Sequence, residues 1–421
     1  MSTIKPMDDL RRVAVVGGGA AGMMAAAVAA RNGAAVTLFE RNEGRLGRKL
    51  RITGKGRCNL TNACTTQEFM EAVPRNARFL YAALARFGPE DTMAHFEGLG
   101  VPLKVERGRR VFPVSDKAAD VVSAMAADLR HSGVQTVYRR VTGLCTEEGR
   151  VTAVRCGEEI HSFDAVILCT GGMSYPLTGS DGDGYRFARS AGHTVTPLTP
   201  SLVPIVADDR VCAQLQGLSL KNVALRIVAA GSGKTVYEDF GEMMFTHFGL
   251  TGPMVLSASA HIRDIAPGKY TAQIDLKPAL DAKQLDARLL ADFAKYANRD
   301  FLNALGDLLP QKLIPVVVAR AGIDPRKKVN LITREERLAL GDLLKGFSVA
   351  LRCFRPIDEA IITAGGVTLK EIDPGTMKSK ITEGLYFAGE LLDLDAYTGG
   401  YNLQIAFSTA VLAGEHAAWG D

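Results

Sequence analysis

The chain has 421 residues, of which 47% are hydrophobic, and a formal net charge of +4. A chain of this length can bury a large core, so we expect two or three domains. The small net charge points to neither a nucleic acid nor a membrane surface as a partner.

The cysteines and the first residues favour a cytoplasmic protein without bound metal. Seven cysteines are scattered along the chain without a C-x-x-C pair, a pattern that suggests neither a disulfide framework nor a zinc site. Acids in MSTIKPMDDLRR stand where a signal peptide has its apolar region. No run of 18 or more apolar residues indicates a membrane span.

Residues 13–40, VAVVGGGAAGMMAAAVAARNGAAVTLFE, predict a strand, a glycine turn, a helix and a second strand. The glycines form G-x-G-x-x-G, in which they permit the turn, the approach of a pyrophosphate and close helix–strand packing. The terminal acid suits a ribose 2′-OH and would repel a 2′-phosphate, which favours FAD or NAD over NADP. The expected cofactor contacts are Gly17, Gly19, Ala20, Ala21, Gly22 and Glu40.

Residues 41–62 predict a basic, glycine-containing loop. A solvated loop is one interpretation, but its position after the ribose-binding acid favours contacts with the two phosphates of a dinucleotide. A nucleic-acid role for the same residues stays open. The basic residues are Arg41, Arg45, Arg48, Lys49, Arg51, Lys55 and Arg57.

Between residues 67 and 192 the patterns alternate between helices and strands. We expect helices over 67–100 and 117–130, a hairpin over 101–114, and strands over 134–144, 151–156 and 159–163. Val141 is placed on a strand that passes the adenine. Residues 164–172, DAVILCTGG, predict a buried strand and a glycine turn, and the acids of the following GSDGDG would repel a pyrophosphate.

The middle of the chain predicts inserted domains. Short β-like runs over 193–276 resemble a small antiparallel sheet or barrel, and 277–345 are helical with apolar residues three and four apart. GSGKT at 231–235 lacks the first glycine of a P-loop and predicts a hairpin turn. We therefore expect a discontinuous Rossmann-like domain over 1–192 and 346–421, interrupted by a β-rich domain and a helical cap subdomain.

The C-terminal residues decide between the two cofactors. GLYFAGE predicts a short strand that ends in an acid, and TGGYNLQ predicts a glycine turn before a helix. A cofactor that reaches from the first glycine turn to this last helix is long, which favours FAD. Donors at that helix N-terminus would stabilise an anionic reduced flavin.

These motifs resemble a bacterial family of FAD-dependent oxidoreductases that includes flavin ene-reductases proposed for bile-acid dehydroxylation and an aminoacetone oxidase. The matching motifs are VAVVGGGAAG, GRKLRITGKGRCNLTN, CTGGMSYPLTGSDGDGY, GEMMFTHFGLTGP, ITAGGV and GLYFAGELLDLDAYTGGYNLQIAFSTAVLAG. The resemblance implies an FAD domain interrupted by a β-barrel-like and a helical domain. Lys55 departs from a glycine that is frequent in the family.

The resemblance also implies which residues contact FAD. The expected contacts, including neighbours within the same turns, are Gly17, Gly19, Glu40, Lys49, Asn59, Val141, Thr170, Gly171, Gly389, Glu390, Asn402, Leu403 and Gln404.

For function, we expect NAD(P)H-dependent reduction of an activated C=C bond in a small or medium organic substrate, with NADH or NADPH binding transiently. An oxygen-dependent amine oxidase that releases peroxide is one alternative. A tRNA-associated flavoprotein and a non-catalytic flavin redox sensor are others. Tyr175, His247 and Tyr401 are candidate proton donors or bases, each with structural packing as a competing explanation. Cys58 beside the basic loop is a candidate low-pKa thiol, but a buried, inert cysteine is the favoured interpretation.

Overall fold

The computed structural model describes residues 10–262 and 264–420, and the chain divides into two compact units. The first unit joins the N-terminal part up to Ser201 with the C-terminal part from Pro356, and the second is Leu202–Arg355. Each unit has a hydrophobic core of its own. The units are therefore described separately.

A parallel sheet forms the centre of the first unit. Its strands are almost continuously apolar, as strands covered on both faces must be, and β1 is buried from Val13 to Val16. The strand order is β19-β10-β1-β2-β6, so the last strand of the chain lies beside β10. These strands are β1 (Arg12–Val16), β2 (Ala35–Phe39), β6 (Gln135–Val137), β10 (Ala165–Leu168) and β19 (Leu385–Phe387).

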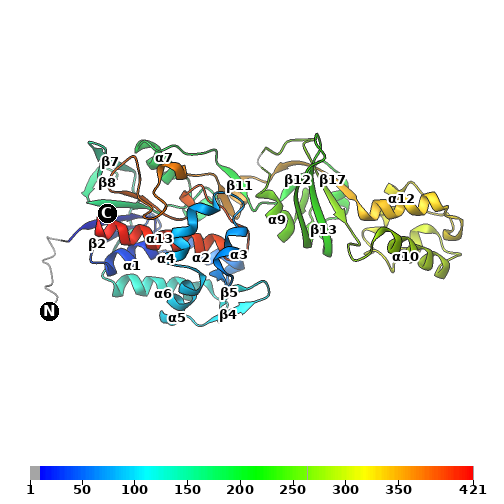
Figure 1. Ribbon diagram of the computed structural model, residues 1–421, viewed down its shortest axis with the longest axis horizontal. Coiled ribbons are helices and arrows are strands. Elements are labelled where there is room, and N and C mark those ends of the chain that lie inside the picture. Colours follow the sequence, from blue (N-terminus) through cyan, green and yellow to red (C-terminus); the bar gives the residue numbers. More distant parts are fainter. Residues whose placement is uncertain (1–9, 263, 421) are drawn as a thin grey trace. The chain divides into compact units, whose positions relative to one another are not determined.

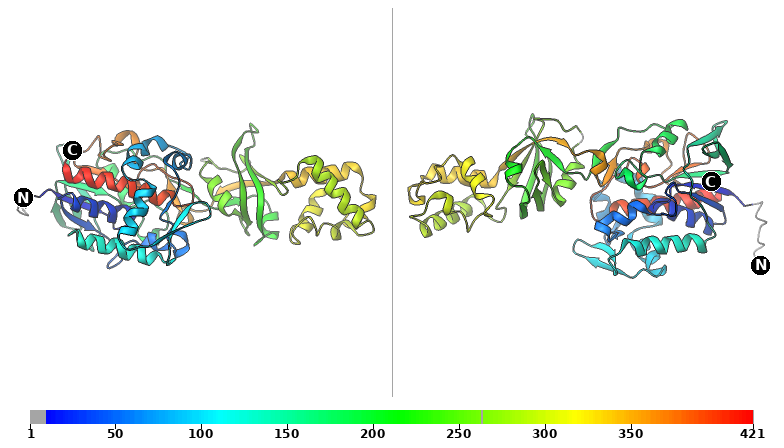
Figure 2. Two further views of the ribbon diagram at one scale, coloured as in Figure 1. Left: turned by 60° about the horizontal axis from the view of Figure 1, so that its bottom comes forward. Right: turned by 180° about the vertical axis from the view of Figure 1, so that it is seen from behind.

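Two helices from opposite ends of the sequence pack closely in this unit. Helix α1 (Ala20–Arg31) lies along α13 (Tyr401–Trp419), as the blue and red helices of Figures 1 and 2 show. A Cβ on Gly414 of α13 would come within 2.6 Å of the Ala25 carbonyl oxygen of α1, so the contact requires glycine there. Helix α6 (Ala118–His131) also packs against α1.

Smaller elements complete the first unit. Two further three-stranded antiparallel sheets, β3-β5-β4 and β7-β8-β9, surround the central one. Their strands are β3 (Thr61–Asn62), β4 (Leu103–Glu106), β5 (Arg110–Pro113), β7 (Gly143–Glu147), β8 (Arg150–Cys156) and β9 (Glu159–Ser162). The short helices are α2 (Arg48–Ile52), α3 (Thr66–Glu71), α4 (Tyr81–Arg86), α5 (Pro89–Gly98) and α7 (Asp183–Ser190).

The second unit is a closed barrel with helices. The barrel order is β12-β15-β14-β13-β16-β17, and residues 230–234 form the turn between β13 and β14, where a hairpin turn was predicted at 231–235. Its strands are β12 (Ile205–Ala207), β13 (Ser219–Ala229), β14 (Thr235–Phe245), β15 (Gly249–Thr251), β16 (Tyr270–Asp275) and β17 (Phe347–Phe354). The helices are α8 (Val211–Gln214), α9 (Pro253–Ser259), α10 (Ala282–Lys295), α11 (Ile314–Ala321) and α12 (Arg334–Lys345).

The unit boundaries differ from the ranges expected from sequence. Strand β17 pairs with β12 and β16 and closes the barrel, so residues 347–354 belong to the second unit. The expected return to the first domain at 346 precedes this strand. An isolated apolar strand gives no sign of which sheet it joins. The fold class is nonetheless a Rossmann-like α/β domain interrupted by a β-barrel and helices.

The two segments of the chain that connect the units pair with each other inside the first unit. Strand β11 (Thr199–Ser201) leads out of the first unit and β18 (Ile362–Ala364) returns to it. They pair antiparallel, with Ser201 opposite Ile362 and Thr199 opposite Ala364. The returning strand thus enters the first unit at a defined register.

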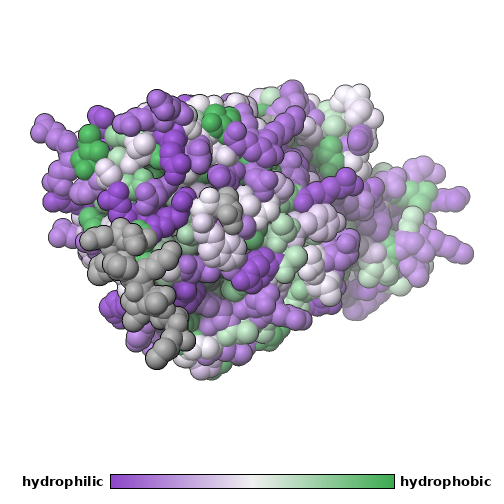
Figure 3. All heavy atoms as spheres, turned by 60° about the vertical axis from the view of Figure 1, so that its left-hand side comes forward, coloured by the Kyte–Doolittle hydropathy of each residue, from purple (hydrophilic) through white to green (hydrophobic). Residues whose placement is uncertain are grey.

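The face of the molecule in Figure 3 is mainly hydrophilic, and its apolar side chains form small separate patches. Within residues 10–262 and 264–420, no helix has the length and hydropathy needed to cross a membrane.

Candidate functional site

A cavity opens beside the carboxyl ends of β1, β2 and β10 in the first unit. It contains about 1340 Å³ of space, part of it open to solvent. Open parallel sheets bind ligands at this end of their strands. The residues expected from sequence that line it are Gly17, Gly19, Ala20, Ala21, Glu40, Arg41, Arg48, Lys49, Val141, Thr170, Gly171, Glu390, Asn402 and Leu403.

The glycine turn after β1 has the geometry of a phosphate-binding turn. Gly17 has a φ of +107°, and a Cβ there would lie 2.6 Å from the Cys169 carbonyl oxygen. A Cβ on Gly22 would lie 1.8 Å from the Gly17 carbonyl oxygen, so this glycine serves helix–strand packing and does not line the cavity. A Cβ on Gly19 would meet nothing within 4 Å, which leaves its backbone open to a ligand at the start of α1.

Glu40 is held rigidly at one end of the cavity. Its side chain is buried, and its Oε2 accepts a hydrogen bond of 2.8 Å from the Gly18 amide. Its Oε1 accepts two from the amide and side chain of Asn42, at 2.7 and 2.6 Å. Each carboxylate oxygen has two lone pairs, so Oε2 retains one for a ribose hydroxyl.

The basic loop is largely paired within the first unit. Arg41 pairs with Asp181, Lys49 with Glu390, and Arg57 with Glu106 and Asp116. Arg48 donates a hydrogen bond of 2.8 Å to the Asn42 side chain and lines the cavity. The loop residues left exposed without such a contact are Arg45, Arg51 and Lys55.

Residues 178–183, which we call the strap, lie along the end of the cavity near Glu40 and Asn42. Asp181 pairs with Arg41 and lies 3.0 Å from Arg140, which also contacts Asp183 at 2.5 Å. Burial would raise the pKa of Asp181, but the two arginines outweigh it and hold that pKa below its usual range. The sequence interpretation took these acids as repelling a pyrophosphate. Here arginines neutralise them, and both acids line the cavity.

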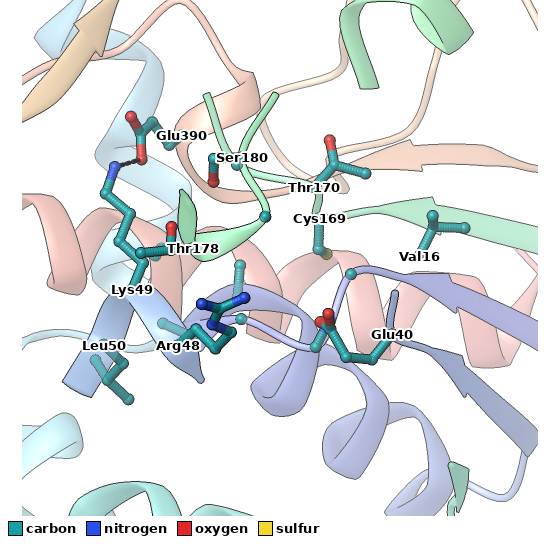
Figure 4. Close-up of a pocket in the computed structure, with 18 of the residues that line it drawn as sticks. Val16, Glu40, Arg48, Lys49, Leu50, Cys169, Thr170, Thr178, Ser180 and Glu390 are labelled. Atoms are coloured by element: carbon teal, nitrogen blue, oxygen red, sulfur yellow. Dashed lines mark hydrogen bonds and ion pairs between the residues drawn. The ribbon is translucent and has the colours of Figure 1, made fainter. Parts of the chain in front are cut away.

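A cluster from four segments closes the other end (Figure 4). The ammonium group of Lys49 on α2 lies 2.5 Å from Oε2 of Glu390 and 2.6 Å from the Ser174 hydroxyl. Oε1 of Glu390 accepts hydrogen bonds of 3.0 Å from Ser174 and from the Thr363 amide. Figure 4 shows Glu40 at the opposite side, with Arg48 between them.

The N-terminus of α13 faces this cavity through Asn402 and Leu403. The Asn402 side chain bonds the backbone of Ala396 at 2.9 and 2.8 Å, so it holds the preceding loop. Gln404 is fully buried and bonds Thr61, at 2.6 Å, and Ser408. Its side chain therefore does not line the cavity.

Three other residues that were expected to contact FAD lie in different parts of the first unit, and only one of them lines the cavity. Gly389 has a φ of +76° and supports a close approach to Ala21, without lining the cavity. Val141 lines it from the loop after β6 and is not on a strand as expected. Asn59 lies outside the lining, although its buried Oδ1 has no hydrogen-bond partner among the described residues.

These features are chemically suited to FAD. Thr170 lines the cavity, and its buried Oγ1 has no hydrogen-bond partner in the part of the chain that the structure describes. Gly19 and Gly400 cap α1 and α13 without a side-chain hydrogen bond, so both helix N-termini keep free N–H donors. The acid suits a ribose hydroxyl of a dinucleotide, and the arginines and the two helix N-termini suit its negatively charged groups.

The candidate catalytic residues do not line the cavity. Tyr401 packs edge-on against Phe69, with ring centroids 5.2 Å apart, and burial raises its pKa to about 12. Tyr175 has an unusual φ of +52°. His247 is exposed in the second unit, between β14 and β15.

Cys58 is the buried, inert cysteine that the favoured interpretation expects, and the alternative of a reactive thiol is wrong. The residue is fully buried, and desolvation raises its pKa to about 12. A basic neighbourhood in sequence does not lower a thiol pKa when the arginines point elsewhere. Over the described residues, no group of three or more His, Cys, Asp or Glu side chains is arranged to hold a metal ion.

Several residues at the site were not singled out from sequence. Asn42 and Ser174 have ordinary surroundings in the sequence. Asn42 bonds Glu40, two residues before it, so its spacing from the expected ribose-binding acid was the available signal, whereas Ser174 bonds Lys49, which is distant in sequence. Thr363 enters through a strand that returns from the inserted unit. Arg140 offered a weak signal in the sequence. It follows Arg139 directly, and this pair of cations had no predicted role.

The fold and the cavity define a Rossmann-type dinucleotide-binding protein. Residues 11–416 match the family described as HI0933-like protein Rossmann domain, and the chain belongs to this family. It is an FAD-type oxidoreductase.

Curated relatives align along most of the chain. A 3-dehydro-bile acid delta(4,6)-reductase of Clostridium scindens is 33% identical over 97% of this chain and 99% of its own length. A ribosomal RNA dihydrouridine synthase of Escherichia coli is 30% identical over 90% of each chain. Among solved structures, a 3-ketosteroid-delta4-(5alpha)-dehydrogenase of Rhodococcus jostii is 18% identical, with a TM-score of 0.47 over 99% of this chain and 98% of that chain.

Proposed function

We propose that this protein is an FAD-dependent reductase that uses NADH or NADPH to saturate an activated C=C bond. The observation that carries the proposal is the single cavity that runs from the glycine turn and Glu40 to Glu390 and the N-terminus of α13. A cofactor that uses both ends must be as long as FAD.

The names of the relatives support the type of reaction. A delta(4,6)-reductase removes ring double bonds, and a dihydrouridine synthase produces the saturated form of uridine. Each reaction adds a hydride and a proton across a C=C bond. A shared site chemistry with different substrates explains both relatives.

In this proposal the two ends of the cavity hold different parts of the cofactor. Glu40 would accept a hydrogen bond from a ribose hydroxyl, and the backbone at Gly19 together with Arg48 would hold the pyrophosphate. Glu390 would hold the ribityl chain. The free amides at the start of α13 would stabilise negative charge on the reduced ring.

A bound FAD would supply the hydride-transfer chemistry between a nicotinamide nucleotide and the substrate. The chain itself orients the substrate and supplies the remaining proton, either from a side chain or from water. Tyr401 directly precedes Asn402 of the cavity lining, and a tyrosine phenol is protonated at neutral pH and can donate that proton. We propose Tyr401, before Tyr175, as the proton donor.

The test is an anaerobic titration of the FAD-loaded protein. NADH or NADPH should bleach the flavin absorbance, and cyclohex-2-enone should then restore it with formation of cyclohexanone. Absence of bleaching by both nucleotides, with peroxide released from an amine in air, would replace this reaction with the amine oxidase alternative.

A second candidate substrate is an RNA base. The ribosomal RNA dihydrouridine synthases among the relatives favour it, as do the exposed cations Arg45, Arg51 and Lys55 of the basic loop. RNA bound through phosphates dissociates steeply as salt rises. Binding of ribosomal RNA fragments at 50 and 200 mM salt, with dihydrouridine as the product, distinguishes this candidate. Failure to bind at low salt rejects it.

A further inference from the structure

A hairpin rich in arginine lies beside the cavity in the first unit. Strands β4 and β5 form it (Figure 1), and residues 107–110, which we call the arginine turn, lie where the two strands join. The side chains of Arg107, Arg109 and Arg110 are exposed. None of the three lines the cavity or has a role in the proposed FAD site.

One buried amide ties the arginine turn to the start of α13. The Asn62 side chain donates hydrogen bonds to the Gly108 carbonyl oxygen at 2.9 Å and to the Gly399 carbonyl oxygen at 3.1 Å. Gly399 lies just before α13, and Asn402 in the first turn of that helix lines the cavity. The arginine turn is therefore fixed next to the helix N-terminus that faces the cavity.

Phe112 of β5 makes a second connection to the cavity. A Cβ on Gly54 would lie 3.2 Å from the Phe112 ring, and Gly54 directly follows Thr53, which lines the cavity. The Arg110 guanidinium lies 5.8 Å from the centroid of the same ring. Arg110 is thus close to residues that border the cavity.

The Arg110 side chain is held in place while its terminal nitrogens stay free. Its Nε donates a hydrogen bond of 3.0 Å to the Arg107 carbonyl oxygen, and its guanidinium contacts the Phe112 ring. Over residues 10–262 and 264–420, Nη1 and Nη2 have no hydrogen-bond acceptor and no ion pair. A guanidinium fixed in this way presents a planar pair of donors that matches two oxygens of a phosphate.

The nearby carboxylates are bound by another cation. Glu106 stands opposite Arg110 across the hairpin, but it pairs with Arg57, which also pairs with Asp116. Arg107, like Arg110, has no ion pair in the described part of the chain. The arginine turn therefore keeps positive charge that the protein itself does not neutralise.

We propose that the arginine turn binds the 2′-phosphate of NADPH and makes the protein prefer NADPH to NADH. This inference rests on the proposed reductase function and names its reductant. The nicotinamide has to reach the flavin ring, which the proposed function places at the start of α13. A dinucleotide extends well beyond its nicotinamide, so its adenosine end can meet a turn beside that helix. Arginine is also the residue that accommodates a 2′-phosphate in NADP-binding proteins.

The test measures the second-order rate constant of anaerobic flavin bleaching in the FAD-loaded protein. NADPH should react about tenfold or more faster than NADH, and Arg110→Gln should slow NADPH about tenfold while NADH stays within about twofold. Arg110→Lys should retain part of the preference, because it keeps the charge and loses the planar pair of donors. Arg189→Gln, at an exposed arginine of α7, is the matched control and should keep the full preference.

Equal rates with both nucleotides, or an equal effect of Arg110→Gln on both, would overturn the inference. If neither nucleotide bleaches the flavin, the reductase reaction fails, and the arginine turn is tested by calorimetry instead. Adenosine 2′,5′-bisphosphate should then bind the FAD-loaded protein more tightly than 5′-AMP, and Arg110→Gln should abolish the difference. No such difference overturns the inference. Weaker binding of ribosomal RNA fragments by Arg110→Gln, with unchanged preference for NADPH, also overturns it, because the turn then contacts RNA.

Discussion

Lys49 and Glu390 form an ion pair of 2.5 Å between segments 341 residues apart in sequence. Lys49 comes from α2 and Glu390 from the turn after β19, and both line the cavity. Ser174 and Thr363 complete the hydrogen bonds of the Glu390 carboxylate. The N-terminal and C-terminal parts of the first unit are therefore in contact at one end of the cavity.

Replacement of Lys49 should destabilise the protein and weaken FAD binding. Lys49→Met leaves the carboxylate of Glu390, whose side chain is 12% exposed, without its cation. The expected loss in the free energy of unfolding is roughly 1–3 kcal/mol. The double variant Lys49→Met/Glu390→Gln should recover part of it, since the unpaired charge is gone. Denaturant unfolding of the FAD-free variants measures the loss in the single variant and the recovery in the double variant. Lys55→Met, at an exposed residue of the same loop, should change little.

Substitutions at two glycines of the G-x-G-x-x-G turn should have separate effects, one on cofactor binding and the other on folding. Gly19→Ala adds a methyl group where no atom lies within 4 Å, so the fold should persist. FAD affinity should fall tenfold or more, because the methyl group occupies the approach of the pyrophosphate. Gly22→Ala should instead reduce soluble expression or the melting temperature, since its Cβ would lie 1.8 Å from the Gly17 carbonyl oxygen. Normal FAD content in Gly19→Ala would contradict the proposed binding mode.

The strap at residues 178–183 should slow the release of FAD. Arg140→Ala removes the contacts with Asp181 and Asp183, at 3.0 and 2.5 Å. Exposed ion pairs contribute about 0.2–1 kcal/mol each, so the loss of both predicts a rise of about twofold to thirtyfold in the dissociation rate. The recovery of free flavin fluorescence measures this rate, and added salt should affect the variant less. Arg31→Ala, which breaks the surface pair with Asp128, should leave the rate unchanged.

The stability of the protein should decrease in mild acid. Burial lowers the pKa of His95, which packs against Phe87 and Phe96, below its usual range. A folded pKa below the unfolded value of about 6.5 means that the unfolded state binds more protons, so stability is complete above that pH and is lost as pH falls. Unfolding at pH 7.5 and 5.5 should show a smaller difference in His95→Gln than in the unmodified protein. His131→Gln, at an exposed histidine, should retain the full difference.

Tyr401→Phe should separate hydride transfer from proton transfer. The ring keeps its packing against Phe69 while the phenolic proton is lost. Bleaching of the flavin by NAD(P)H should be unchanged, and turnover of the enone should fall by tenfold or more. Equal turnover in Tyr401→Phe and the unmodified protein would leave Tyr175 or water as the donor, which Tyr175→Phe then distinguishes.

The strands, the glycine turn and the position of Glu40 could be predicted because their patterns are local. A buried strand, a G-x-G-x-x-G turn and an acid at a fixed spacing are all contained in residues 13–40. The closed barrel was expected only as a small sheet or barrel, because strand order depends on pairing between distant residues.

The electrostatics of the site could not be predicted from sequence. Asp181 and Asp183 looked unfavourable for phosphates until the fold placed Arg41 and Arg140 beside them. Cys58 has basic neighbours in sequence, yet burial decides its pKa, as the favoured interpretation of an inert cysteine requires. Charges act through distance in space and through solvent exposure, and neither can be read from adjacency along the chain.

The paired strands β11 and β18 make the second unit a removable module. Ser201, the last residue before the insertion, stands opposite Ile362, which lies six residues after Pro356, where the chain re-enters the first unit. After removal of residues 202–355, residues 356–361 would remain to connect the two paired strands as a loop. The same junction would accept a barrel from a relative, so chimeras could exchange the inserted domain while the Rossmann core and its cavity stay constant.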